Sequence, residues 1–401
     1  MSVIKNISQE LIYFEDKYVE KIAKDMVEIS TAVKKGENVF IFFDFGGKQL
    51  ALKLAEYSIK KKSRVYYMVR DMDMNAVLIK NSNEKDISRF YSFDNVKFFE
   101  ADVTFLIRCP RSEFIFEDIE AEKMKIFNEA SKPAVMDFRV NYTRWCLIYW
   151  PTKEKAKLEK MSFENYLKMY FKACFQDWDR IEKENALLKK VLDKGKHLVL
   201  KANLYSSDPK KKTHLEMSIE GMTFANSTID YNYPGSEVFS SPVRDSVNGQ
   251  VFAQGVYSYN GKYMEDIYLK FENGKVVEAS AKKGENNLLD ILNTDEGARY
   301  LGEIALGTNP GIRRRVFDPL LNEKVGGSFH FALGKSYEDR VYKGQNVKLF
   351  NGNVSLIHWD ITIPLLKKYG GGEVWVDGKL IQKDGKFLLP GIKILNTNLN
   401  S

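Results

Sequence analysis

Two polar residues near the C-terminal end, in "SLIHWDI" (355–361), have types and a spacing that suit metal coordination. His358 and Asp360 are two positions apart, and in a β-strand such residues point to the same face. An imidazole and a carboxylate on one face are ligands for Zn, Co, Mn and related divalent ions. Taken alone, the pair favours a simpler interpretation, in which an exposed strand carries an ion pair.

Two glutamates lie in apolar segments bounded by turns. Glu237 stands in "YNYPGSEVFSSPV" (231–243) between a Pro-Gly turn and an apolar pair, and Glu303 stands in the glycine-bounded run "GEIALG" (302–307). Burial of an unpaired carboxylate is costly, and a shared dication would neutralise several carboxylates at once. The alternatives are that Glu237 caps a helix and that Glu303 is exposed.

A second histidine, His330, lies between two phenylalanines in "FHFALGKSY", with Tyr337 seven residues later. A histidine of this kind also suits a core position with satisfied ring nitrogens, and the tyrosine suits ordinary packing. The other two histidines, His197 and His214, have polar, lysine-rich neighbours, and we assign them no chemistry. The sequence contains neither a GxSxG elbow nor an HExxH pair, which argues against a serine hydrolase and a thermolysin-type protease.

Four of these segments, in this order, resemble the thermophilic-type metalloaminopeptidases, the aminopeptidase T and aminopeptidase S family. The segments are "PGSEVFSSP", "GEIALGTNPGI", "HFALGKSY" and "IHWD". The resemblance extends more loosely over the N-terminal half, from "VKKGENVFIF" onward, and so covers nearly the whole chain. It implies an enzyme that uses two nearby divalent ions, Zn, Co or Mn, to remove the N-terminal residue of a peptide.

The resemblance also implies roles for individual residues. In a mechanism with two metal ions, we expect Glu303 to bridge the ions or to take the proton of the attacking water, and Tyr337 to donate a hydrogen bond to the developing oxyanion. The resemblance makes Tyr337 the hydroxyl that helps the reaction. It further implies peptide substrates and a homodimer. The residues that it assigns to the metal ions are Glu237, Glu303, Glu323, His330, His358 and Asp360.

Two other functions remain open at this point. One is a non-catalytic metal-binding protein on a peptidase fold, which would hold metal in stoichiometric amounts and hydrolyse no peptide. The other is a phosphoester hydrolase with two metal ions, because the same ion pair serves phosphate chemistry.

The elements that must position these residues fall into two parts, with a predicted boundary after residue 194. In the first part, 1–194, the apolar runs 38–44 and 64–71 flank a helical segment and predict a βαβ unit with both strands buried in a parallel sheet. The segment 162–194 contains neither Gly nor Pro. It therefore predicts one long helix, capped by Ser162, that closes this α/β domain.

The second part, 195–401, predicts a β-rich α+β domain that carries the catalytic residues. Its short alternating runs are separated by Asn-Gly and Asp-Gly pairs, in "YNGKY", "ENGKVV", "VDGK" and "KDGK". Such pairs are strong signals of antiparallel hairpins. One helix is expected over 286–302.

Composition limits the class of protein. A chain of 401 residues predicts two domains, and 44% hydrophobic with 29% charged residues is typical of a globular protein. The net charge of +7 is spread along the chain, which argues against a nucleic-acid partner. The sequence has no run of about 18 apolar residues, so we expect no membrane span. An N-terminus with early acidic residues and three widely separated cysteines predict a cytoplasmic protein without a secretory signal.

Overall fold

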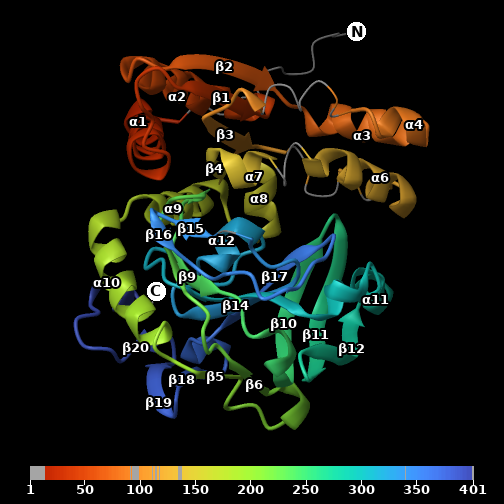
Figure 1. Ribbon diagram of the computed structural model, residues 1–401, viewed down its shortest axis with the longest axis vertical. Coiled ribbons are helices and arrows are strands. Elements are labelled where there is room, and N and C mark those ends of the chain that lie inside the picture. The colour runs from red at the N-terminus through yellow and green to blue at the C-terminus, as the bar shows by residue number, and fades with distance from the viewer. Residues whose placement is uncertain are drawn as a thin grey trace. The chain divides into compact units, whose positions relative to one another are not determined.

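The computed structural model describes residues 14–90, 92, 99–110, 112, 115–116, 118–133, 138–338 and 340–399. Residues 1–13, on which the prediction of no secretory signal partly rests, lie outside this set. The chain forms two compact units (Figure 1). The first unit contains the chain up to Cys174 together with residues 229–234, and the second contains 175–228 and 235–401.

The first unit is built on a five-stranded sheet in the order β2-β1-β3-β4-β8 (Figure 1). Each strand pairs with its neighbours in parallel. The strands are β1 (Asn38–Phe43), β2 (Arg64–Val69), β3 (Val103–Arg108), β4 (Arg144–Tyr149) and β8 (Asn232–Tyr233). The helices are α1 (Asp16–Asp25), α2 (Lys48–Lys60), α3 (Met72–Asn81), α4 (Glu84–Ile87), α6 (Ala121–Lys132), α7 (Val140–Tyr142), α8 (Lys153–Leu158) and α9 (Phe163–Cys174). The βαβ unit predicted around residues 38–71 is therefore confirmed as β1-α2-β2.

The strand β2 differs from the prediction in its burial. It lies at the edge of the sheet, and its side chains are mostly exposed, with Tyr67 at 76% exposure. The run "RVYYMV" is as apolar as that of a central strand, so the sequence pattern did not reveal its edge position. The prediction that both strands are buried is correct for β1 and wrong for β2.

The predicted helix over 162–194 is two helices. The first, α9, starts after Ser162, whose hydroxyl accepts a hydrogen bond from the Asn165 backbone N–H at 3.3 Å. The second, α10 (Trp178–Leu192), begins after Asp177, whose carboxylate accepts a hydrogen bond from the Arg180 N–H at 3.0 Å. An aspartate at such a position stabilises a new helix start. The absence of Gly and Pro was therefore an insufficient signal, and the predicted boundary after residue 194 differs from the division described above.

The second unit contains two larger sheets (Figure 1). An eight-stranded antiparallel sheet has the order β12-β11-β10-β6-β5-β18-β19-β20. Its strands are β5 (His197–Ala202), β6 (Thr213–Ser218), β10 (Asn248–Tyr259), β11 (Lys262–Glu272), β12 (Lys275–Lys283), β18 (Gly372–Val376), β19 (Lys379–Lys383) and β20 (Lys386–Phe387). The Asn-Gly and Asp-Gly pairs connect β10 to β11, β11 to β12, β18 to β19 and β19 to β20, all with positive φ angles, so the predicted hairpins are confirmed.

A five-stranded antiparallel sheet, in the order β17-β14-β13-β9-β7, carries the candidate site residues. Its strands are β7 (Ala225–Ser227), β9 (Glu237–Ser240), β13 (Leu301–Gly307), β14 (Ser328–Gly334) and β17 (His358–Pro364). The strands β15 (Val341–Tyr342) and β16 (Gln345–Asn346) form a separate hairpin, and α11 (Glu285–Leu292) and α12 (Pro319–Glu323) complete the unit with α10. The helix expected over 286–302 is shorter, because Asp295 caps a separate 3₁₀ turn at 296–299. The predicted α/β first part and β-rich second part are confirmed.

One face of this five-stranded sheet is an apolar core face. Phe331 of β14 is fully buried, and its ring meets that of Phe271 on β11 edge-on at a centroid distance of 6.3 Å. The Tyr257 hydroxyl of β10 donates a hydrogen bond to the Thr362 carbonyl of β17 at 2.8 Å. The opposite face is therefore the one available for polar side chains.

The variant Phe331→Ala should lower the free energy of unfolding by about 3–5 kcal/mol, since it removes a fully buried ring and leaves a cavity. Chemical denaturation of wild type and variant measures the difference. The control Leu356→Ala, at a side chain with 50% exposure, should stay within about 0.5 kcal/mol of wild type. Equal losses in both variants would contradict the assignment of this face as the core.

Candidate metal centre

Strand register places four of the predicted site residues on one face of the five-stranded sheet. Ala332 of β14 lies directly opposite both Glu303 of β13 and Asp360 of β17. Opposite residues of antiparallel strands share a face, and so do residues two apart in one strand. His330 is two positions from Ala332, and His358 is two positions from Asp360, so both histidines join the two acids.

Glu237 reaches the same face from β9. It lies opposite Gly307, which is four positions after Glu303 on β13. The positions of β13 and β14 next to the polar side chains on this face hold small residues. They are Ala305, Gly307, Ala332 and Gly334.

The sequence contains a further signal for this arrangement. The strands β13 and β14 read "EIALG" and "HFALG", and both run polar, large, Ala, Leu, Gly. One polar side chain followed by two small residues on the same face, in adjacent strands, places the two polar groups near each other on that face. Each strand alone is an ordinary apolar run.

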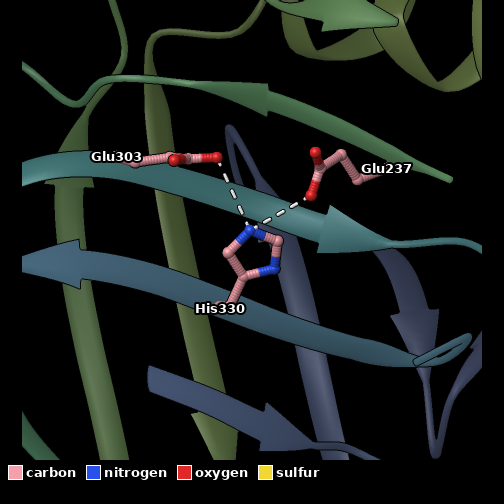
Figure 2. A group of neighbouring side chains, drawn as sticks. All are labelled: Glu237, Glu303 and His330. Atoms are coloured by element: carbon pink, nitrogen blue, oxygen red, sulfur yellow. Dashed lines mark ion pairs between the residues drawn. The ribbon is translucent and has the colours of Figure 1, made fainter. Parts of the chain in front are cut away.

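The first group of converging side chains is fully buried (Figure 2). His330 Nε2 lies 3.3 Å from Glu237 Oε2 and 3.5 Å from Glu303 Oε1. Figure 2 shows both carboxylates pointing toward the same ring nitrogen from neighbouring strands. The three side chains therefore offer one nitrogen and two oxygens to a single point.

The second group lies at the less buried end of the face. His358 Nε2 is 3.1 Å from Glu303 Oε2 and 3.7 Å from Asp360 Oδ2. The other ring nitrogen, Nδ1, lies 2.7 Å from the Lys335 carbonyl oxygen. A carbonyl only accepts, so Nδ1 carries the hydrogen, and a neutral His358 presents the lone pair of Nε2 to the two acids.

Glu303 belongs to both groups and contributes a different oxygen to each. In each group, one candidate ligand atom per residue lies within 4.8 Å of the others. A carboxylate placed in this way is suited to bridge two ions.

Buried side-chain atoms without a hydrogen bond, and the chemical types of these side chains, both suit the binding of divalent ions. Within the described part of the chain, Glu237 Oε2, His358 Nε2 and Asp360 Oδ1 are buried and make no hydrogen bond. Buried polar atoms in proteins are normally satisfied, so a cluster of buried nitrogen and oxygen atoms without hydrogen bonds is suited to bind a cation. Imidazole nitrogens with carboxylate oxygens are a donor set for Zn, Co or Mn. The residues therefore fit one ion in each group.

Protons balance the charge of this cluster in the metal-free protein. Burial acts to raise the pKa of Glu303, but its close interactions with His330 and His358 hold that pKa well below its usual range. Burial acts to lower the pKa of His358, and Asp360 and Glu303 outweigh it and raise the pKa to about 10. A metal ion must displace these histidine protons, so we expect metal binding to release protons.

Glu323, the sixth predicted ligand, lies at the end of α12 and outside both groups. Its Oε2 accepts from Lys324 Nζ at 2.9 Å. Burial raises the pKa of Glu323 to about 8, with Lys324 opposing and Asp360 and Glu237 adding to the shift. The carboxyl group is thus close to the cluster, and its role as a ligand remains a prediction. Sequence reasoning missed Lys324, whose only signal is its place beside Glu323 in an apolar segment.

Tyr337 lies beside the second group. Its ring is edge-on to His358 at a centroid distance of 5.3 Å and 5.2 Å from the ring of Phe239. Burial and the charge of the nearby carboxylates raise the pKa of Tyr337 well above its usual value. The phenol therefore keeps its proton and is suited to donate a hydrogen bond.

The variant Tyr337→Phe should lower kcat by about 100-fold, the usual effect of removing one hydrogen-bond donor to an oxyanion. The fold should be retained, because the ring contacts with His358 and Phe239 remain. Steady-state kinetics on an aminoacyl amide measure the change. A kcat equal to that of wild type would remove Tyr337 from the set of residues that act on the substrate.

The sequence pattern of the thermophilic metalloprotease family, M29, matches residues 15–387. The chain belongs to this family. The predicted family and the predicted class of metallopeptidase are thereby confirmed. Membership of the M29 family implies a centre that binds divalent metal. The two groups of converging side chains are the candidate sites for that metal.

Individual relatives agree with this membership. "Aminopeptidase 2" of Geobacillus stearothermophilus is 24% identical over 406 aligned positions, which cover 92% of this chain and 95% of that protein. The solved structure of wild-type AmpT from Thermus thermophilus has a TM-score of 0.75 at 22% identity and covers 93% of this chain and 100% of its own. A 2,5-dihydroxypyridine dioxygenase from Pseudomonas putida KT2440 shares the fold with a TM-score of 0.55 at 13% identity, over 94% of this chain and 99% of its own.

Proposed function

We propose that this M29 protein is an aminopeptidase that removes the N-terminal residue of peptides with two divalent ions, Zn, Co or Mn. The observation that carries the proposal is the position of Glu303, which offers one oxygen to each of two histidine-containing groups. The full-length likeness to "Aminopeptidase 2" supports the exopeptidase reaction. The proposed ligands are those predicted from the sequence: Glu237, Glu303, Glu323, His330, His358 and Asp360.

The bound ions would polarise the scissile carbonyl and lower the pKa of the attacking water. The protein side chains supply the remaining functions. Glu303 holds the two groups at a fixed separation through its two oxygens. Tyr337 donates its hydroxyl hydrogen to the developing oxyanion. A carboxylate of the cluster pairs with the free α-ammonium group of the substrate, which restricts cleavage to the first residue.

A panel of aminoacyl amides tests this function before and after chelation, with Co, Zn or Mn added back. Hydrolysis should disappear on chelation and return with metal, and N-acetylated peptides should resist cleavage. Full activity in the metal-free protein would contradict the proposal. Hydrolysis of phosphate esters in the same panel would indicate a phosphoester hydrolase. Binding of metal in stoichiometric amounts without hydrolysis of any substrate would indicate a metal-binding protein.

We further propose that the enzyme is a cytoplasmic homodimer. The three cysteines, Cys109, Cys146 and Cys174, form no disulfide bond, which suits a reducing compartment. No helix in the described parts of the chain combines the length and the apolar character needed to cross a membrane. Sedimentation of the purified protein tests the dimer, and a monomer at micromolar concentration would contradict it.

A further inference from the structure

Lys324 is a buried lysine at the candidate metal centre, and the proposed reaction gives this lysine no role. Its side chain is 2% exposed, and its Nζ lies 2.6 Å from Glu237 Oε1 and 2.9 Å from Glu323 Oε2. Lysine is almost never fully buried unless it is paired. Its pairing with two carboxylates, both of them proposed ligands, points to a specific task.

The backbone around Lys324 is held tightly against β13. The carbonyl of Lys324 accepts a hydrogen bond from the Asn309 N–H at 3.0 Å. At Gly307, a Cβ atom would lie only 2.4 Å from the Val325 carbonyl oxygen and 2.8 Å from that of Glu323. A side chain at 307 would therefore push this loop away. Gly307 is the residue opposite Glu237, so the close approach also brings Lys324 to that carboxylate.

The ammonium group divides the two oxygens of Glu237 between two partners. Oε1 is bound to Lys324, and Oε2 is the oxygen that faces His330 at 3.3 Å. A carboxylate whose one oxygen is held in a charge-assisted hydrogen bond presents only the other to an ion. Glu323 is held by its Oε2 in the same way.

We propose that Lys324 is a positioning residue of the metal centre. It makes Glu237 bind its ion through Oε2 alone, and it leaves Glu323 only Oε1 to offer to a metal ion. This inference rests on the proposed function, because it requires that the cluster binds metal. A purely structural ion pair would stabilise the fold and leave the coordination of the metal unchanged.

The variant Lys324→Met tests the proposal. Once freed, Glu237 and Glu323 can offer further oxygens, so the Co(II)-loaded variant should bind the same number of ions as wild type with a changed visible absorption spectrum. Loss of a residue that orients ligands should also lower kcat by about 10- to 100-fold. The matched control is Lys155→Met, at a lysine with 3% exposure whose Nζ lies over the Tyr149 ring, in the first unit. The control should keep the wild-type spectrum and kcat per folded molecule.

A folded Lys324→Met variant with the wild-type Co(II) spectrum would overturn the proposal. If that variant does not fold, Lys324→Gln carries the test, since the amide is shorter and uncharged and must also change the spectrum. A wild-type protein that binds no Co(II) at all would instead refute the proposed function, so the two failures are distinguishable.

Discussion

The variant Glu303→Gln should lose peptide hydrolysis by roughly a thousandfold or more, because a shared carboxylate contributes several kcal/mol through the ions that it holds. Each Glu303 oxygen faces a different histidine, at 3.5 Å and 3.1 Å. An amide keeps the size of the side chain but replaces one oxygen by an NH₂ group, which cannot bind a cation. One of the two histidine-containing groups then lacks the oxygen of residue 303, and this side chain no longer links the two proposed ions.

Metal analysis and steady-state kinetics on an aminoacyl amide measure this effect. The variant should retain fewer than two ions per chain. Glu184→Gln is the matched control, since Glu184 is also a buried glutamate but binds the backbone N–H groups of Lys393 and Leu395. That control should lose stability and keep its turnover per folded molecule. Full activity of Glu303→Gln would exclude a bridging carboxylate at this position.

The variant His358→Ala should lose both tight metal binding and turnover. His358 is the only nitrogen donor of the second group, and the Lys335 carbonyl orients its ring so that Nε2 faces the two acids. Removal leaves Asp360 and one oxygen of Glu303, and carboxylates alone bind Zn or Co less well than a set with imidazole.

Calorimetric titration with Zn and the amide assay measure this second effect together. One of the two binding events should disappear, and hydrolysis should fall to the level of the chelated wild type. The control His214→Ala replaces an exposed histidine on β6 and should behave as wild type in both measurements. Retention of two tight sites in His358→Ala would contradict the assignment of the second group.

Local patterns in the sequence predicted much of the candidate site. The pair His358 and Asp360 is two residues apart in one strand, so its common face follows from strand geometry. Glu237 and Glu303 were notable because each lies in a short apolar segment. Their meeting with His330 could not be derived from local patterns, because it depends on the register of β9, β13 and β14. The family resemblance supplied that association.

Other features depended on tertiary structure that leaves little trace in the sequence. Lys324 approaches Glu237 only because the loop packs onto Gly307, a contact between distant parts of the chain. The exposure of β2 follows from its place at the sheet edge, and the break before α10 follows from a capping aspartate within an otherwise helical segment. For Lys324 and β2 a partner outside the local window decided the outcome, whereas the capping Asp177 is a local signal within a segment whose pattern is otherwise helical.

The fold alone does not decide the reaction. A dioxygenase shares it at 13% identity, so the same architecture carries unrelated chemistry. The proposal for this chain therefore rests on family membership and on the shared carboxylate between two histidine-containing groups.

The short strand β8 has a consequence for how the protein can be dissected. Residues 229–234 return to the first unit, where β8 pairs with β4 and the Leu147 N–H donates to the Tyr231 carbonyl at 2.8 Å. Glu237 follows only four residues after this strand ends. A fragment ending at residue 194 would leave β4 as an unpaired edge, and unpaired edges promote aggregation. A fragment starting at residue 195 would carry a strand without its sheet. The segments of the two units thus alternate along the chain, and we expect neither unit to fold properly as a fragment cut at residue 194.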